Sequence, residues 1–178
     1  MKEFVLALTV FRILAGPIIF FVSIFLEMYF LALALFLTAA ATDYFDGKLA
    51  RDHHVESDLG EILDPIADKL LLLFVLIVII LESHDAYIGI MSCLILAREI
   101  WITGLREYAA RINLKDATKV TMLGKSKTTI QFIAVAMFLL GFGLQLALLI
   151  FVAKFVLFLA LLLTIKSALD YTQKVFDS

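Results

Sequence analysis

The sequence predicts an all-α integral membrane protein, a bundle of six transmembrane helices. Its 178 residues are 63% hydrophobic and only 18% charged, and the mean hydropathy is +1.03. Soluble domains average about 45–50% apolar and about 25% charged residues, so this composition lies outside the globular range. A chain of this length also has too small an interior to bury so many apolar side chains. The apolar runs are long and do not alternate, which favours helices over the strands of a membrane barrel.

Six stretches are apolar over the roughly 20 residues that a membrane span requires. They cover residues 4–26, 29–50, 62–82, 86–108, 128–146 and 147–169. No linker, internal repeat or low-complexity tract separates them, so we expect a single domain over residues 1–178. The N-terminal apolar run has no small-residue cleavage site after it, so no removable signal peptide is expected.

Polar or turn-forming segments bound each predicted span. The first span is followed by Glu27, and the second ends in a charged segment that begins at residue 43. The third span starts within that segment and ends at 83–85, and the fourth ends in the basic segment 109–127. The fifth and sixth spans are expected to be joined by a Gly-Phe-Gly turn within 141–146.

Lysine and arginine lie on one side of this predicted bundle. The connections at 27–28, 83–85 and 141–146 contain neither residue. The opposite side holds Lys2, Lys48, Arg51, Arg111, Lys115, Lys119, Lys125, Lys127 and Lys174. Because positively charged short loops stay in the cytoplasm, we expect both termini and the connections 48–61 and 109–127 to be cytoplasmic. Without a transit peptide, a compact chain of this kind is expected in a bacterial cytoplasmic (inner) membrane.

Charge and cysteine content exclude several classes of protein. The net charge of −2 gives no reason to expect a nucleic-acid partner. Cys93 is the only cysteine, so an internal disulfide and a cysteine-based zinc site are both excluded. Lys154 is expected to extend its side chain toward a membrane interface. The polar residues of the outer connections are expected to be ordinary interfacial caps: Glu27, Glu82, His84 and Asp85.

Four aspartates lie where the second and third spans meet the cytoplasm. Asp43 and Asp46 are three residues apart and Asp64 and Asp68 are four apart, so each pair shares one helix face. The two spans are antiparallel and joined by a short loop, so the two acidic faces can meet. Carboxylates so close together need protons or cations between them. Oxygen ligands favour Mg²⁺ or Mn²⁺, and four carboxylates are enough to hold two ions.

Small and basic residues accompany the aspartates. Gly47, Ala50 and Gly60 leave room for a ligand close to the backbone, and Arg51 can donate two hydrogen bonds to a phosphate. A purely structural alternative makes Asp64 the N-cap of a helix and the following proline its first residue. That alternative accounts for Asp64 alone.

Residues 43–68 read Asp-x2-Asp-Gly-x2-Ala-Arg-x8-Gly-x3-Asp-x3-Asp. This pattern resembles the signature of the CDP-alcohol phosphotransferase family. The resemblance implies six membrane helices, a homodimer, and release of CMP from a CDP-linked lipid when an acceptor alcohol attacks the β-phosphorus. It implies that Asp68 is the base for the acceptor hydroxyl. It further implies metal binding by Asp43, Asp46, Asp64 and Asp68, and CDP binding by Asp46, Gly47, Ala50, Arg51, Gly60 and Thr9.

Basic residues on the fourth and fifth spans are the candidates for acceptor binding. Arg98 lies about 12 Å outward of Arg106 along the helix axis, and Lys125 and Lys127 lie at the predicted cytoplasmic start of the fifth span. Together they suit a small anionic phosphate. Glu99 follows Arg98 directly and is not expected to neutralise it. Two alternatives remain: an ion pair of Arg98 with an aspartate on another helix, and simple cytoplasmic anchoring by the lysines.

These segments resemble one branch of the same family. Arg98-Glu-x5-Leu-Arg106 and Gly-Lys125-x-Lys127-Thr are similar to the phosphatidylglycerophosphate synthases, which use CDP-diacylglycerol and sn-glycerol 3-phosphate. Leu-Thr9-x2-Arg12 also matches that branch, although the stretch before it is apolar here. Arg12 is therefore a further predicted phosphate contact.

Other functions remain as alternatives. The same chemistry with serine, inositol phosphate or phosphatidylglycerol as acceptor is one alternative, and the basic residues of the fourth and fifth spans favour glycerol 3-phosphate over it. A divalent-cation transporter would need carboxylates near the bilayer midplane and a path to both faces. An aspartate-rich prenyl transferase would have denser acidic motifs separated by more of the chain.

Overall fold

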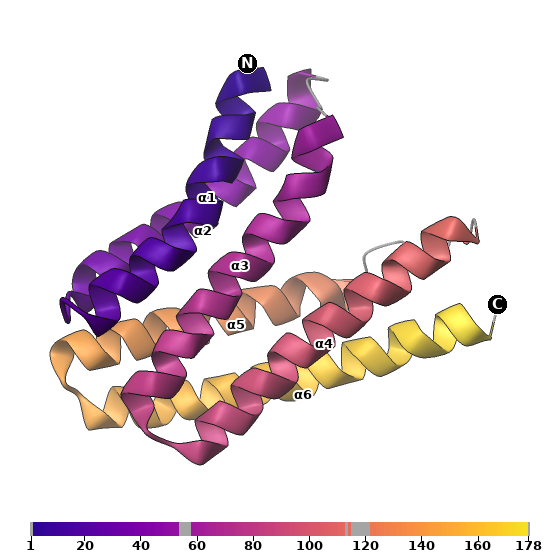
Figure 1. The fold of residues 1–178 in the computed structure, drawn as a ribbon. Coiled ribbons are helices and arrows are strands. Elements are labelled where there is room, and N and C mark those ends of the chain that lie inside the picture. The colour runs from indigo at the N-terminus through magenta and orange to yellow at the C-terminus, as the bar shows by residue number, and fades with distance from the viewer. Residues whose placement is uncertain (1, 54–57, 113, 115–121, 178) are drawn as a thin grey trace. The chain divides into compact units, whose positions relative to one another are not determined.

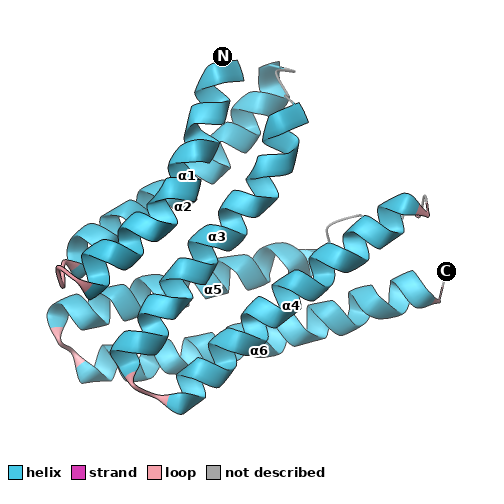
Figure 2. Cartoon of the chain, in the orientation of Figure 1, coloured by secondary structure: helices cyan, strands magenta, loops and turns pink. Residues whose placement is uncertain are grey.

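The computed structural model describes residues 2–53, 58–112, 114 and 122–177, without the side chains of 2–5, 43–53, 58–62 and 122–127. Over these residues the chain forms helices and no strand (Figure 2). The helices are α1 (Lys2–Ile24), α2 (Tyr29–His53), α3 (Asp58–Ser83), α4 (Ala86–Arg111), α5 (Met122–Leu144) and α6 (Ala147–Phe176) (Figure 1). Each corresponds to one predicted apolar run, which confirms the all-α prediction.

Three described helices are long and apolar enough to cross a membrane: Leu6–Ile24, Ala86–Arg111 and Ala147–Phe176. The apolar parts of α2 and α5 are shorter, and α3 has Asp64, Asp68 and Lys69 in its first half. Large apolar side chains are exposed along these helices, including Phe151, which is 71% exposed. Exposed apolar surface of this extent is typical of helices that contact lipid. The chain therefore has the character of a membrane protein.

The predicted Gly-Phe-Gly turn is wrong. Residues 141–143 lie inside α5, which ends at Leu144, and the turn to α6 is made at Gln145 with a φ of 52°. A Cβ added at Gly143 would lie 3.2 Å from the ring of Phe30. Gly143 therefore allows close packing inside α5, and the left-handed conformation at the turn is adopted by Gln145 instead.

The chain divides into two compact units, Met1–Glu82 with Leu139–Leu146, and Ser83–Phe138 with Ala147–Ser178. In the first unit, α1 and α3 run in the same direction, with Thr9 beside Asp64 and Phe20 beside Phe74 (Figure 1). Gly16 lets the two helices approach, because an added Cβ would lie 3.2 Å from the Leu70 carbonyl oxygen. The fully buried core of this unit includes Ala15, Ile19, Ala32, Phe36, Ala39, Leu71, Val75 and Ile79.

In the second unit, α4 and α6 also run in the same direction. Trp101 of α4 donates from Nε1 to the hydroxyl of Thr172 on α6 at 3.1 Å. Nearby, an apolar cluster is formed by Ile102, Leu105, Ala109 and Val175, with Leu114, Ala168 and Tyr171 packed against it. These contacts fix the part of α4 that bears the predicted acceptor-binding arginines.

Candidate active site

One face of α1 is turned toward α3 in the first unit. Thr9, Arg12 and Gly16 follow one another at helical spacing, so they share that face. At Gly16 an added Cβ would lie 3.2 Å from the Leu70 carbonyl oxygen of α3, and the side chains of Arg12 and Thr9, one and two turns before it, are fully buried. The absence of a side chain at Gly16 thus allows both polar residues to reach α3.

Asp64 and Asp68 receive these polar groups on α3. Arg12 donates from Nη1 to Asp68 Oδ1 at 2.6 Å and from Nη2 to Asp64 Oδ1 at 2.9 Å. The hydroxyl of Thr9 donates to the same Asp64 oxygen at 2.8 Å. One guanidinium therefore bridges two carboxylates that belong to one turn of one helix, and it fixes their orientation.

Asp64 is not a helix N-cap. The helix α3 begins at Asp58, so Asp64 and Pro65 both lie inside it. The structural alternative for Asp64 is therefore wrong: the carboxylate accepts bonds from α1 rather than from the first turn of its own helix.

The charge distribution at this point is unusual for a helix interior. The Arg12 side chain is 0% exposed, whereas those of Asp64 and Asp68 are 41% and 47% exposed. An unpaired buried guanidinium would be strongly destabilising, so the two ion pairs are needed for Arg12 to be buried at all. The half-exposed carboxylates still present oxygen atoms to a ligand.

This donor set fits a hard divalent cation. Both described carboxylates offer oxygen only, which Mg²⁺ and Mn²⁺ prefer. Within the described residues no group of three metal-ligating side chains occurs. Asp43 and Asp46 lie on the helical backbone of α2, but their side chains are outside the described set, as are those of Ala50 and Arg51. The backbone of Gly47 lies in α2 and that of Gly60 in α3.

The predicted acceptor-binding residue Arg98 lies in a polar network of the second unit. It is 8% exposed and donates from Nε to the carbonyl oxygen of Thr164 at 3.1 Å. Its Nη2 donates to the hydroxyl of Ser167 at 3.2 Å, and its Nη1 to Glu99 at 2.9 Å. The expectation that Glu99 would not neutralise Arg98 is therefore wrong, because the two long side chains bend toward each other from neighbouring positions.

Sequence reasoning did not identify the partners of Arg98. Gln131 of α5 donates to the Thr164 hydroxyl at 2.9 Å, so the network joins all three helices of this unit. Gln131 and Thr164 are both buried polar residues in otherwise apolar helices. That is the signal that could have found them, because buried polar groups in such helices need partners.

The other predicted acceptor-binding residues lie on α4 and α5. Arg106 is exposed on α4, two turns beyond Arg98. Lys125 and Lys127 lie in the first turns of α5, which begins at Met122 rather than at residue 128, and their side chains are outside the described set.

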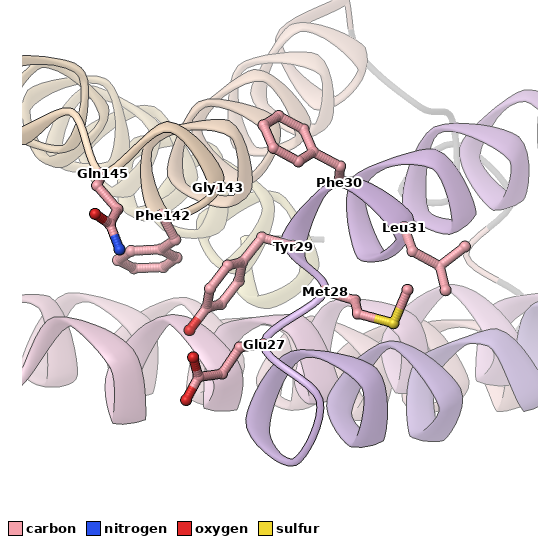
Figure 3. Close-up of a pocket in the computed structure, with 8 residues that line it drawn as sticks. All are labelled: Glu27, Met28, Tyr29, Phe30, Leu31, Phe142, Gly143 and Gln145. Carbon is pink, nitrogen blue, oxygen red and sulfur yellow. The ribbon is translucent and has the colours of Figure 1, made fainter.

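Each unit has a further set of contacts near the short connections between its helices. In the first unit, the hydroxyl of Tyr29 donates to Glu82 at 2.6 Å. An open pocket of about 300 Å³ lies beside Tyr29 and is lined by Glu27, Met28, Phe30, Leu31, Phe142, Gly143 and Gln145 (Figure 3). In the second unit, Asp85 caps α4 as expected, accepting from the Tyr87 backbone N–H at 2.8 Å. Lys154 extends toward the connection before α4, where its ammonium pairs with Asp85 and lies 5.1 Å from the Tyr87 ring centroid.

The chain matches a known family over most of its length. The model of the CDP-alcohol phosphatidyltransferase family covers residues 6–166, a range that contains Thr9, Arg12, the four aspartates and the basic residues of α4 and α5. The chain belongs to the CDP-alcohol phosphatidyltransferase family. The family prediction from the aspartate motif is thereby confirmed, and membership makes the chain a transferase that takes part in phospholipid synthesis.

Several curated members of this family are similar to the chain, and each is named CDP-diacylglycerol–glycerol-3-phosphate 3-phosphatidyltransferase. The protein of Cereibacter sphaeroides is 41% identical over 143 residues, which cover 78% of this chain and 63% of that protein. The protein of Wigglesworthia glossinidia brevipalpis is 40% identical over 130 residues, covering 72% of this chain and 71% of that protein. The protein of Shigella flexneri serotype 5b is 34% identical over 168 residues, which cover 92% of this chain and 90% of that protein.

Proposed function

We propose that this CDP-alcohol phosphatidyltransferase moves the phosphatidyl group of CDP-diacylglycerol to sn-glycerol 3-phosphate, giving phosphatidylglycerophosphate and CMP. The relatives that match the chain are named for this reaction. In the structure, the proposal rests on one observation: Asp64 and Asp68, half-exposed on one turn of α3, are held together by the buried Arg12. The second half of the family motif is thus an ordered pair of carboxylates.

The metal site is proposed to comprise Asp43, Asp46, Asp64 and Asp68, with two ions of Mg²⁺ or Mn²⁺. The helix bounds support this grouping. Asp43 and Arg12 each lie roughly 20 Å along their antiparallel helices from the turn between α1 and α2, so they are at a similar level in the first unit. When bound, the ions supply positive charge that polarises the pyrophosphate and neutralises the departing CMP.

Asp68 is the proposed base. The acceptor hydroxyl oxygen forms a bond to the β-phosphorus, and the bond between that phosphorus and the oxygen bridging to CMP breaks. The hydroxyl proton passes to Asp68 and then to solvent, while CMP leaves with the electron pair of the broken bond. The ion pair from Arg12 to Asp68 Oδ1 supports this role, because it orients the carboxylate.

The nucleotide of the donor lipid is proposed to bind beside the aspartates. Asp46, Gly47, Ala50 and Arg51 come from the second half of α2. Gly60 and Thr9 contribute from α3 and α1. Small residues in this set let a nucleotide approach the helix backbone, and Arg51 offers paired donors to a phosphate.

Acceptor binding is proposed for the basic residues of α4 and α5. Arg106 is exposed, so it is available to the phosphate of glycerol 3-phosphate, and Lys125 and Lys127 add positive charge at the start of α5. Arg98 and Arg12 were predicted for the same phosphate. Every nitrogen of the Arg98 guanidinium donates to a protein group, so Arg98 supports the acceptor site by fixing α4 against α6.

The proposed setting is the inner membrane of a bacterium, with residues 1–178 as one catalytic domain of a homodimer. All six helices are proposed to cross the membrane, with both termini and the active site on the cytoplasmic side. The connections between α1 and α2, α3 and α4, and α5 and α6 contain no lysine or arginine, which supports this orientation. Surrounding membrane lipid then contacts the exposed apolar side chains.

The test is CMP release by the purified protein in detergent with CDP-diacylglycerol and Mg²⁺. We expect release that requires glycerol 3-phosphate and that stops when EDTA is added. Release with serine, inositol phosphate or phosphatidylglycerol instead would retain the catalytic role of the aspartates and reject the assignment of the basic residues. No release with any acceptor would reject the proposed reaction.

A further inference from the structure

Arg12 is a permanently charged residue with a fully buried side chain, and it is the one charged residue of α1 after Glu3. Its two Nη atoms donate to two different carboxylates, at 2.6 Å and 2.9 Å. Both carboxylates, Asp64 and Asp68, belong to the proposed metal site. A cation supplied by the protein itself therefore contacts the same two carboxylates that are proposed to bind a divalent ion.

We propose that Arg12 is a positioning residue, an internal counter-ion that neutralises and orients Asp64 and Asp68 while the site holds no divalent ion. This inference rests on the proposed metal site and goes beyond it, since it gives Arg12 a role without substrate contact. Two carboxylates on one helix turn repel each other. The Arg12 guanidinium removes that repulsion and keeps the pair aligned before metal binds.

The neighbouring contacts support a built arrangement. Thr9 shares the Asp64 oxygen with Arg12, which fixes this carboxylate from two positions on α1. Gly16 permits the close approach of α1 and α3 that brings the guanidinium within reach. Because the Arg12 side chain is 0% exposed, it is not free to follow a substrate phosphate into solvent.

The proposal has a thermodynamic consequence. Arg12 and a bound divalent ion are cations that act on the same two carboxylates, so Arg12 lowers the affinity of the site for metal while it stabilises the metal-free protein. Replacing Arg12 by a neutral residue should therefore make the folded protein depend more strongly on metal. A residue that merely bound substrate would not produce this change.

The experiment measures thermal unfolding of the purified protein in detergent, with EDTA or with MnCl₂ and without substrate. In EDTA, R12Q should unfold roughly 5–10 °C below wild type, because a buried ion pair has lost one partner. With MnCl₂, R12Q should gain about twice the stabilisation in Tm that wild type gains. Mn²⁺ binding followed by electron paramagnetic resonance should show about tenfold tighter binding by R12Q.

Two further variants separate charge from structure. R12K keeps the charge without the two-pronged geometry, so its Mn²⁺-dependent gain should equal that of wild type. T9V removes a neutral hydrogen bond to the same Asp64 oxygen and should also leave the gain unchanged. R111Q, which breaks an exposed pair with Glu107 on α4, is the control, and its Tm should match that of wild type both in EDTA and in MnCl₂.

A gain by R12Q that is equal to or smaller than the wild-type gain would overturn the proposal. An enlarged gain in R12K as great as that in R12Q would do the same, because charge would not then be the cause. If R12Q cannot be recovered in EDTA, R12Q and wild type are purified with Mg²⁺ and compared by Mn²⁺ binding, and binding by R12Q that is no tighter than by wild type would overturn the proposal. A wild-type protein with no response to Mn²⁺ would count against the proposed metal site itself.

Discussion

Arg98 of α4 donates from Nε to the backbone carbonyl oxygen of Thr164 on α6, at 3.1 Å. A charged side chain is thus tied to the main chain of another helix, and Gln131 secures the same threonine through its hydroxyl. Side-chain donors of this kind join helices that gain little from apolar contacts in lipid. The network therefore holds α4 in place about two turns before the exposed Arg106.

Replacing Arg98 by glutamine should cost stability more than acceptor affinity. The Thr164 carbonyl, Ser167 and Glu99 would lose donors in a buried setting, so Tm should fall by about 5 °C or more. Thermal unfolding and acceptor kinetics on one preparation provide the check. An unchanged Tm with a tenfold higher KM for glycerol 3-phosphate would instead make Arg98 a direct acceptor contact.

Replacing Asp68 by asparagine should separate binding from turnover. Asparagine keeps an oxygen that can accept the bond from Arg12 but cannot take a proton as a carboxylate does. We expect affinity for CDP-diacylglycerol to change little and kcat to fall by roughly 10²–10⁴-fold. Lipid binding measured beside CMP release tests this, and equal losses in both would reject Asp68 as the base.

Replacing Arg106 by alanine should raise the KM for glycerol 3-phosphate by about tenfold or more, with a smaller effect on the KM for the lipid. The expectation follows from its exposure and its place in the Arg98–Arg106 motif. R111A is the matched control, because Arg111 is an exposed arginine one to two turns further along α4 that pairs with Glu107. Identical kinetics for R106A and wild type would remove Arg106 from the site.

Replacing Gly16 by alanine should destabilise the protein despite alanine's higher helix propensity of about 1 kcal/mol. The new Cβ would lie 3.0 Å from the Phe74 ring and 3.2 Å from the Leu70 carbonyl oxygen, which is main chain and cannot turn away. G104A is the matched control, since no described atom outside its own helix backbone lies within 4 Å of a Cβ there. We expect Tm to fall for G16A and to stay level or rise for G104A.

The pair of Asp85 and Lys154 should give a stability contribution that depends on pH. The hydrogen bond from Lys154 holds the pKa of Asp85 below its ordinary value of 3.8. The contribution is therefore fully present above about pH 3.8 and is lost as the pH falls through the lower pKa of the folded protein.

The substitution K154M tests this pair. It should lower Tm by roughly 2 °C at pH 7, and the difference from wild type should shrink as the pH is lowered below 3.8. A difference that stays constant from pH 7 to pH 3 would show that Lys154 acts through packing on Tyr87 rather than through its charge.

Hydropathy predicted all six helices because a membrane span needs a long apolar run, and such runs are visible in one dimension. The predicted bounds of α4, for example, differ from the observed ones only at its C-terminal end. The Gly-Phe-Gly segment misled the prediction, since glycine permits a turn and close packing equally, and only the contact with Phe30 distinguishes the two.

The aspartate motif was predicted from spacing, but the partners of Asp64 and Asp68 were not. Thr9 and Arg12 lie more than fifty residues away in sequence. Their meeting depends on the register of α1 against α3, which Gly16 and Phe74 set by shape. A single sequence gives the polar residues of each helix but not which of them face each other.

The close approach at Gly16 bears on how this protein can be studied outside its membrane. Lipid tails solvate apolar side chains about as well as a protein interior does, so such a contact gains its strength from shape and dispersion rather than from exclusion of water. Detergent micelles offer the same apolar surroundings. The spacing of α1 and α3, and with it the bridge from Arg12 to the two aspartates, should persist from bilayer to micelle.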